Sequence, residues 1–424
     1  MKFSSICVIG LGYIGLPTAS SFATHGIRVF GVDNNPAVIK SLQNGQAHIY
    51  EPGLREVVSD AVSSGNLKVL DKPVEADAFI IAVPTPFYGD KKADMSFVTS
   101  AAESIVPVLR KGNLVVLEST SPPLTTRELV LPILERSGLK AGRDFKLAYS
   151  PERVLPGQIL RELVENARVI GGIDQASSEA GRDLYATFVK GEIVLTDSTT
   201  SEMVKLMENT YRDINIAAAN EFSRLADRFG VDVWEAIQIA NRHPRVKILN
   251  PGPGVGGHCI SVDPWFFVES APDITNLILA ARKVNDSQPE FAARLVEKAM
   301  SGEEATRVAC LGLAYKPDVD DLRESPAIEV TKSLAASGKE VTIFEPYKPD
   351  FEVPGARNCD SLEAAVRDAQ VIVLLVGHTQ FKQIDPVQLA KISTARTLVD
   401  TVNSWNKQRF SSAGFKTYRL GVGK

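Results

Sequence analysis

Short aliphatic and β-branched runs alternate with longer amphipathic segments over the first part of the chain. Six runs have the length and composition of buried strands: ICVIG (6–10), IRVFGVD (27–33), AFIIAVP (78–84), LVVLEST (114–120), FKLAYSP (145–151) and ARVIGG (167–172). The segments between them are long enough for helices. Alternating strands and helices are typical of a parallel sheet that is covered on both faces. The pattern predicts an α/β domain over residues 1–197.

Near residue 197 the pattern changes to one long amphipathic segment. Apolar residues recur at helical spacing up to Gly230, and Thr199 with Glu202 three residues later has the spacing of a capping box. Two further helical segments flank a glycine-rich stretch: DVWEAIQIA (232–240) and ITNLILAARKVND (274–286). We predict an all-helical domain over residues 198–302, whose long helix is a candidate dimer interface.

Strands and helices alternate again from Arg307 onward. The strand-like runs are RVACLGLAY (307–315), EVTIFEP (340–346), VIVLLVGH (371–378) and TLVDTV (397–402). Ser325 and Pro326 are typical of the start of a helix, and Gly338 of its end. A second α/β domain is therefore predicted over residues 303–424. The predicted fold is two Rossmann-like, doubly wound parallel-sheet domains joined by a central all-helical domain.

Composition and charge narrow the classes of partner. Of 424 residues, 44% are hydrophobic and 23% charged, as in globular proteins. Lys and Arg number 47 against 51 Asp and Glu, so we expect no binding to nucleic acid. No apolar run is long enough to predict a membrane span. The four cysteines lack the spacing of disulfide frameworks or CxxC pairs, so we expect reduced thiols, no metal and a cytoplasmic location.

The clearest local motif is a glycine-rich turn between the first strand and a helix. It reads Gly10-Leu11-Gly12-Tyr13-Ile14-Gly15. In a dinucleotide-binding fold the first glycine makes the turn, the second admits the pyrophosphate, and the third allows close packing of helix and strand. Asp33 ends the next strand, where a carboxylate can bind a ribose diol and would repel a 2′-phosphate. The motif predicts NAD as the cofactor.

Cys259 lies in a second glycine-rich stretch, GPGVGGHCISVDP (252–264). Asp263 and Pro264 have the pattern of an N-cap and first helical residue, which places the thiol just ahead of a helix N-terminus. Such a position stabilises a thiolate, but the spacing fits a buried structural cysteine equally well. His258 suggests a Cys–His pair, although neighbours in an extended chain point in opposite directions.

Lys205 and Asn209 are four residues apart on the predicted long helix and share one of its faces. A solvated polar stripe is one interpretation, and a pair of donors that stabilises an oxyanion is the other. NAD together with a cysteine suggests oxidation of an alcohol through an aldehyde. A thiolate can add to the aldehyde, and loss of a second hydride from the adduct gives a thioester.

The motifs together resemble those of the UDP-sugar 6-dehydrogenases. They are GLGYIGLP, VPTP (83–86), ESTSPP (118–123), SPERVLPG (150–157), the Lys205–Asn209 pair, GPGVGGHC and LAYKPDVDDLRESP (313–326). Their order and spacing cover nearly the whole chain. The resemblance implies a four-electron oxidation of the sugar C6 alcohol to a carboxylate with two NAD molecules, in a homodimer.

The resemblance also implies catalytic roles for individual residues. Cys259 would form the thiohemiacetal and then the thioester. Lys205 and Asn209 would stabilise the oxyanion, and Asp263 would assist proton transfer to or from water. Thr120 and Glu152 would position water and substrate.

Binding roles follow from the same resemblance. The cofactor would be held by the glycine turn, including Tyr13 and Ile14, and by a second set of residues: Asp33, Thr85, Thr120 and Arg323. The UDP-sugar would be held by residues of five segments, one of which is the loop NRHPRV (241–246): Arg153, Val154, Lys205, Asn209, Arg245, Gly256 and Lys316. Arg245 would reach a neighbouring subunit.

Two positions depart from the UDP-glucose branch of the family. Pro156 stands where that branch commonly has glutamate, and Val262 where it has lysine. Both suit the branch that acts on N-acetylated sugars, so the expected substrate is UDP-N-acetyl-D-mannosamine. UDP-N-acetyl-D-glucosamine and UDP-glucose are the alternative substrates. A nucleotide-sugar-binding protein without catalysis, and a one-step hydroxy-acid dehydrogenase, are the alternative functions.

Overall fold

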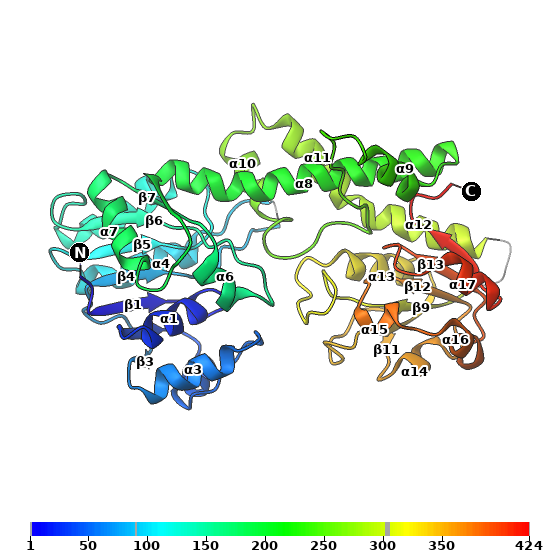
Figure 1. The fold of residues 1–424 in the computed structure, drawn as a ribbon, viewed down its shortest axis with the longest axis horizontal. Coiled ribbons are helices and arrows are strands. Elements are labelled where there is room, and N and C mark those ends of the chain that lie inside the picture. The colour runs from blue at the N-terminus through cyan, green and yellow to red at the C-terminus, as the bar shows by residue number, and fades with distance from the viewer. Residues whose placement is uncertain (1, 90, 302–305, 424) are drawn as a thin grey trace. The chain divides into compact units, whose positions relative to one another are not determined.

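The computed structural model describes residues 2–89, 91–301 and 306–423. Figure 1 shows its helices and strands. By packing, the chain divides into two compact units: Met1–Glu208 with Trp265–Pro272, and Asn209–Pro264 with Asp273–Lys424. Each unit contains one sheet, so the predicted pair of α/β domains with a helical region between them in sequence is confirmed. The predicted boundaries at 197 and 302 stay predictions, and the second of them falls outside the described residues.

The sheet of the first unit has eight strands in the order β3-β2-β1-β4-β5-β6-β7-β8. They are β1 (Ser5–Ile9), β2 (Arg28–Val32), β3 (Leu67–Leu70), β4 (Ala78–Ile81), β5 (Leu114–Leu117), β6 (Lys146–Tyr149), β7 (Arg168–Gly172) and β8 (Ile193–Asp197). Strands β1 to β6 are parallel, whereas β7 runs antiparallel to β6. The strand order reverses between β1 and β4, which is where doubly wound sheets bind ligands.

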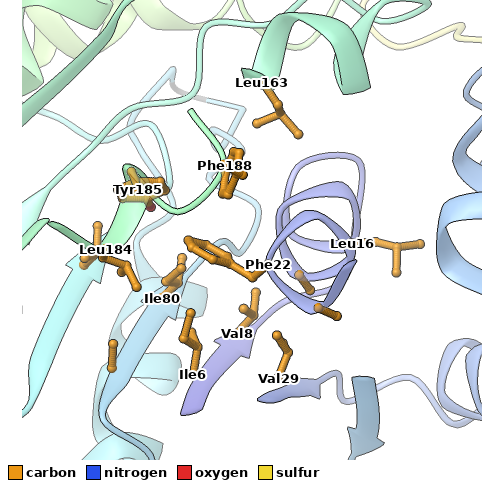
Figure 2. Close-up of a cluster of buried hydrophobic side chains, with 14 of the residues drawn as sticks. Ile6, Val8, Leu16, Phe22, Val29, Ile80, Leu163, Leu184, Tyr185 and Phe188 are labelled. Carbon is orange, nitrogen blue, oxygen red and sulfur yellow. The ribbon is translucent and has the colours of Figure 1, made fainter. Parts of the chain in front are cut away.

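Helices cover both faces of this sheet, because alternate strand residues point to opposite sides. Ile6 and Val8 face a core shared with α1 (Gly15–Thr24), α3 (Leu54–Ser63), α6 (Ile159–Glu165) and α7 (Gln175–Tyr185). Figure 2 shows this core, in which Phe22 of α1 packs edge-on against Phe188 with ring centres 4.7 Å apart. Residues Cys7 and Ile9 face the other core, which contains residues of α4 (Ser96–Ile105), η2 (Thr126–Val130) and α5 (Leu131–Leu134).

The sheet of the second unit has six parallel strands in the order β11-β10-β9-β12-β13-β14. They are β9 (Arg307–Leu311), β10 (Glu340–Phe344), β11 (Ala356–Asn358), β12 (Val371–Leu374), β13 (Thr397–Asp400) and β14 (Lys416–Arg419). All four strands predicted here are present. The sequence analysis missed the outermost strands of both sheets, β3, β8, β11 and β14, because these short edge strands carry at most three consecutive apolar residues.

Helices α13 (Pro326–Ala336), α14 (Leu362–Val366), α15 (Thr379–Lys382), α16 (Pro386–Ile392) and α17 (Lys407–Ser412) accompany the second sheet. The predicted start of α13 is confirmed. The Ser325 hydroxyl accepts a hydrogen bond from the Ala327 N–H, and Pro326 is the first helical residue. The helix ends two residues before Gly338, whose φ of 81° lies in the left-handed region.

The helical region contains α8 (Ser198–Phe229), α9 (Val233–Ala240), α10 (Asp263–Ser270), α11 (Asn276–Asp286) and α12 (Gln288–Met300). The predicted long helix is confirmed as α8, which ends directly before Gly230. The predicted capping box is wrong. Asp197 caps the helix instead and accepts hydrogen bonds from the backbone and hydroxyl of Thr200. Glu202 is buried and accepts hydrogen bonds from the backbone N–H groups of Leu124 and Thr126.

Within the described part of the chain, no helix combines the length and apolar character that crossing a membrane requires.

Candidate active site

The three glycines of the first turn differ in the space around them. Gly10 has a φ of 92°, and a Cβ atom there would lie 2.4 Å from the Ala82 carbonyl oxygen. A Cβ atom on Gly15 would lie 1.8 Å from the Gly10 carbonyl oxygen. At Gly12, by contrast, a Cβ atom would meet no protein atom within 4 Å. The first and third glycines are thus required by the turn and its packing, whereas the second borders open space.

The surroundings of this turn suit a dinucleotide. Helix α1 starts at Gly15 with no side-chain cap and no acidic residue in its first turn, so its N-terminus can accept an anion. Asp33 follows β2, and its carboxylate accepts hydrogen bonds from the N–H groups of Leu11 at 3.1 Å and Asn35 at 2.9 Å. The carboxylate therefore lies beside the turn. Tyr13 and Ile14 are partly buried, and Tyr13 packs against the core.

Thr85 and Thr120 follow the neighbouring strands β4 and β5, and both are partly exposed. The hydroxyl of Ser119 joins their segments, because it accepts a hydrogen bond from the Val83 N–H and donates one to the Val83 carbonyl. Since β4 pairs with β1 and β5 pairs with β4, all in parallel, the two threonines lie at the same edge of the sheet as the glycine turn.

Glu152 belongs to a buried charge cluster that the sequence analysis did not predict. Arg168, at the start of β7, donates hydrogen bonds to Glu152 at 2.9 Å and to Ser150 at 3.0 Å, and also pairs with Glu118. Its guanidinium lies 3.8 Å from the ring centre of Tyr185, which donates a hydrogen bond to Glu118. The available signal was the charge of Glu118 and Arg168 inside otherwise apolar strand segments.

The environment of this cluster shifts the acidity of Glu118. Burial disfavours its carboxylate more strongly than Arg168 favours it, and the neighbouring Glu152 charge adds to the effect, so the pKa of Glu118 is raised to about 7. Both carboxylates share one guanidinium. The ion pair with Arg168 thus holds the carboxyl group of Glu152 in place. Glu118 of the same cluster can gain or lose a proton near neutral pH.

The polar pair on α8 is buried. Lys205 is 7% exposed and Asn209 is 8% exposed, so the alternative interpretation of a solvated stripe is wrong. Burial of a lysine is unusual without a function or a partner. Arg153 is a predicted substrate contact outside this helix, and its guanidinium forms an ion pair of 2.7 Å with Glu208 of α8. The neighbouring Val154, also predicted, packs against the core of the first unit.

Asn209 is bound to the second predicted acid of the site. Its side-chain amide donates a hydrogen bond of 2.6 Å to the buried carboxylate of Asp263. Helix α10 begins at Asp263 itself. The prediction had Asp263 as the N-cap and Pro264 as the first helical residue, so the helix begins one residue earlier than predicted. The Cys259 carbonyl accepts hydrogen bonds from the N–H groups of Val262 at 3.0 Å and Asp263 at 2.8 Å, so a tight turn carries Cys259 directly into α10.

Cys259 differs from the other three cysteines in its exposure. It is partly exposed, whereas the others are buried in the cores: Cys7, Cys310 and Cys359. Burial raises the pKa of the Cys7 and Cys310 thiols to about 12. Of the four, Cys259 is therefore the thiol that is not buried, contrary to the alternative of a buried cysteine.

The glycines before Cys259 allow its loop to pack closely on the loop after β9. A Cβ atom on Gly256 would lie 2.6 Å from the Glu324 carbonyl oxygen, and one on Gly257 would lie 2.9 Å from the Tyr315 ring. The Gly257 N–H donates a hydrogen bond of 2.9 Å to the Arg323 carbonyl. The two loops are thus held at fixed positions within the second unit.

His258 lies in a turn, contrary to the expectation of an extended chain. Residues 258–262 form a turn, and Gly257 before it has a φ of 88°. Nδ1 of His258 lies 3.8 Å from Oδ2 of Asp321. Burial opposes the charged imidazole, but the neighbouring Asp321 carboxylate and Cys259 outweigh it, and the pKa of His258 is raised to about 9.

A cavity of about 230 Å³ lies at the carboxyl edge of the second sheet, next to the reversal of strand order between β9 and β12. Its lining contains two lysines, Lys316 and Lys382, and no acidic residue. Such a lining suits a diphosphate. The sequence analysis predicted Lys316 and missed Lys382 and Ser404, although both follow strands that end at this edge.

Two other predicted contacts lie outside this cavity. Arg323 donates hydrogen bonds to Asp321 from its backbone and its guanidinium, and its side chain is 47% exposed. Arg245 lies in the exposed segment between α9 and the Cys259 loop.

Comparison with known proteins identifies the family along the whole chain. Models of three domains of the UDP-glucose/GDP-mannose dehydrogenase family match in order: the NAD-binding domain over residues 4–189, the central domain over 199–287 and the UDP-binding domain over 309–407. These domains agree with the placement of the glycine turn in the first unit and of the two-lysine cavity in the second.

Individual relatives are similar over their full lengths. A UDP-N-acetyl-D-mannosamine dehydrogenase of Methanocaldococcus jannaschii is 48% identical over 425 residues, which cover 99% of this chain and 97% of the relative. An NDP-N-acetyl-D-galactosaminuronic acid dehydrogenase of Ralstonia nicotianae is 46% identical and covers 97% of this chain and 99% of the relative.

Among solved structures, that of a UDP-D-ManNAc dehydrogenase from Pyrococcus horikoshii is similar with a TM-score of 0.92 and 43% identity, covering 99% of both chains. The resemblance drawn from the sequence motifs is thereby confirmed. The chain belongs to the UDP-glucose/GDP-mannose dehydrogenase family and is an NAD-dependent dehydrogenase of UDP-sugars.

Proposed function

We propose that this enzyme oxidises the C6 alcohol of UDP-N-acetyl-D-mannosamine to the carboxylate of UDP-N-acetyl-D-mannosaminuronate, in two NAD-dependent steps. The observation that carries the proposal is the partly exposed Cys259 in a rigid glycine loop, four residues before Asp263, whose carboxylate binds Asn209. A protein that only binds nucleotide sugars has no need of this arrangement. The choice of sugar rests on the relative from Methanocaldococcus jannaschii.

The chain's own residues supply the covalent chemistry. When bound, NAD accepts a hydride from the substrate in each oxidation. After the first oxidation, Sγ of Cys259 adds to the C6 carbonyl and forms a thiohemiacetal, and Lys205 and Asn209 stabilise the oxyanion. Loss of a second hydride leaves a thioester. Water attacks its carbonyl carbon, the C–S bond breaks, and Asp263 assists the proton transfers that release the acid and restore the thiol.

Other residues bind and orient. The open space at Gly12 and the carboxylate of Asp33 suit the pyrophosphate and the ribose of NAD, with Thr85 and Thr120 beside them. Glu152, held by Arg168, positions water and substrate together with Thr120. The lysines of the two-lysine cavity, Lys316 and Lys382, hold the diphosphate of the UDP-sugar. The remaining contacts follow the family pattern: Arg153, Val154, Arg245, Gly256 and Arg323.

We also propose that the enzyme is a homodimer in the cytoplasm. Helix α8 presents an exposed apolar stripe at helical spacing: Met203, Met207, Tyr211, Phe222, Leu225 and Phe229. Contiguous apolar surface of this kind is typical of protein–protein interfaces. The cytoplasmic location rests on the four free cysteines.

The experiment that tests the proposed function follows NADH absorbance with limiting UDP-sugar. Two NADH per UDP-N-acetyl-D-mannosamine are expected, with little from UDP-N-acetyl-D-glucosamine, UDP-N-acetyl-D-galactosamine or UDP-glucose. Cys259→Ser should abolish formation of the acid, and Cys359→Ala, at a buried cysteine, serves as the matched control. One NADH per substrate in the wild type would exclude the double oxidation, and preference for another sugar would move the enzyme to that substrate.

A further inference from the structure

Two separate segments at the carboxyl edge of the second sheet carry the lysines of the two-lysine cavity. Lys316 lies in the loop after β9, and Lys382 lies at the end of the short helix α15 after β12, the strand that pairs with β9. Gly377 leaves room for the second lysine, since a Cβ atom there would lie 3.3 Å from Cε of Lys382. The spacing of the two lysines therefore depends on the contacts that join these segments.

His378 joins the two segments from a fully buried position. Its Nδ1 accepts a hydrogen bond of 2.8 Å from the N–H of Asp318, two residues after Lys316. Its carbonyl accepts hydrogen bonds from the N–H groups of Phe381 at 2.9 Å and Lys382 at 3.1 Å. One residue is thus bonded to the segments of both lysines.

The other ring nitrogen of His378 is fixed by Glu345, which follows β10. Because Nδ1 accepts a hydrogen bond, the ring proton is on Nε2, which donates to Oε2 of Glu345 at 3.1 Å. The same carboxylate accepts hydrogen bonds from the N–H groups of Leu313 at 2.6 Å and Ala314 at 3.0 Å, just before Lys316. Burial disfavours this carboxylate, but these hydrogen bonds outweigh the effect and hold the pKa of Glu345 below its usual value. The orientation of the imidazole is therefore fixed on both sides.

A second contact between the segments involves Asp318, whose φ of 61° lies in the left-handed region. This backbone conformation is uncommon for a residue with a side chain. The Asp318 carboxylate accepts hydrogen bonds from the Thr379 N–H at 2.8 Å and the Thr379 hydroxyl at 2.6 Å. The bonds to His378 and Thr379 thus hold the end of the Lys316 loop against the start of α15.

We propose that His378 is a positioning residue for the UDP-sugar, which sets the spacing of Lys316 and Lys382 so that both bind the diphosphate. In this role His378 bonds to the two segments and not to the ligand. A ligand with two phosphates gains from a fixed spacing of two cations, whereas a single phosphate can bind to one of them. The inference rests on the proposed function, in which this cavity holds the diphosphate.

The test measures binding of UDP and of UMP by isothermal titration calorimetry, without NAD. An asparagine amide oxygen can take the place of Nδ1, and a glutamine amide nitrogen that of Nε2. His378→Gln keeps the donor to Glu345 but loses the acceptor for the Asp318 N–H, and should bind UDP at least about tenfold more weakly. His378→Asn keeps that acceptor and should bind UDP within about threefold of the wild type. The affinity of both variants for UMP should change by less than about threefold, since one lysine suffices.

Controls separate this role from a purely structural one. Thermal unfolding shows that each variant is folded, and His25→Gln, at an exposed histidine of the first unit, should bind UDP as the wild type does. Thr379→Val, at an exposed position, removes the hydroxyl bond to Asp318 and should weaken UDP binding about threefold, which tests the inference if His378→Gln does not fold. In turnover, folded His378→Gln should raise the KM for the UDP-sugar about tenfold and leave the KM for NAD within about twofold.

The outcomes distinguish this inference from the proposed function. Wild-type UDP affinity in folded His378→Gln, or in Thr379→Val where His378→Gln does not fold, would overturn the inference alone. Equal losses of UDP and UMP affinity would also overturn it, because they indicate a general change of the cavity. A wild type that binds no UDP would refute the assignment of the cavity and the inference with it, and the NADH stoichiometry tests the sugar separately.

Discussion

At the scale of single residues, two glycines of the same turn are required for different reasons. Gly15 is required by the protein itself, because a Cβ atom there would lie 1.8 Å from the backbone oxygen of Gly10. Gly12 is not, because no protein atom lies within 4 Å of the corresponding position. The motif makes both glycines look alike, and only the coordinates separate a packing requirement from a space left for a ligand.

Alanine substitutions at these two positions should therefore have different effects. The free energy of unfolding of Gly12→Ala should differ from that of the wild type by less than about 0.5 kcal/mol. Its affinity for NAD should nevertheless be at least about tenfold weaker, because the new methyl group occupies the space expected for the pyrophosphate. Gly15→Ala should lose at least about 3 kcal/mol of stability through backbone displacement.

Urea unfolding and the NAD-dependent rise in melting temperature measure the two effects. Unchanged NAD binding by Gly12→Ala would contradict the placement of the cofactor. A Gly15→Ala protein as stable as the wild type would contradict the close packing of α1 on β1.

At the scale of elements, α8 helps to fix the segment that carries Thr120. Its Glu202 accepts hydrogen bonds from the N–H groups of Leu124 and Thr126 and from the Thr126 hydroxyl, at the start of the π-helical turn η2. Leu124 has a φ of 74°, which is strained for a residue with a branched side chain. The carboxylate thus holds a strained turn between Thr120 and η2, one helical turn from Lys205.

Glu202→Gln should destabilise the enzyme by about 2–3 kcal/mol, because its amide group can no longer accept all three hydrogen bonds in a buried position. Urea unfolding measures the change. Glu221→Gln, at an exposed position of the same helix, is the matched control and should change stability by less than about 0.5 kcal/mol. Equal stability of the two variants would show that Glu202 does not hold the turn.

At the scale of the whole molecule, the exposed stripe of α8 predicts self-association. Met207 is 56% exposed and Tyr211 is 71% exposed, one turn apart on the same face. The double variant Met207→Glu and Tyr211→Glu should weaken the dimer at least about 100-fold, since two carboxylates would be buried without partners.

Sedimentation equilibrium of the wild type and the double variant measures this effect. Val387→Glu, which changes an apolar residue 53% exposed on α16, should leave the dimer intact. A monomeric wild type, or a double variant that sediments as a dimer, would refute the assignment of this interface.

The sequence by itself determined the fold class, the glycine turn with Asp33, the long helix and the presence of Cys259 beside a helix start. These features depend on local periodicity and on residues that are close along the chain, where backbone geometry dictates the spacing. The edge strand β8, for example, was not predicted, because its apolar run is short, from Ile193 to Leu195, and its residues are half-exposed.

Only the tertiary structure decided which charged groups share an environment. Arg168 and Glu118 are 50 residues apart, and His258 and Asp321 are 63 apart, so no local pattern relates them. The same holds for the direction of a side chain, since Glu202 does not cap its own helix but accepts hydrogen bonds from Leu124 and Thr126. Burial and electrostatics depend on these distant contacts, and the chemistry of the site depends on both.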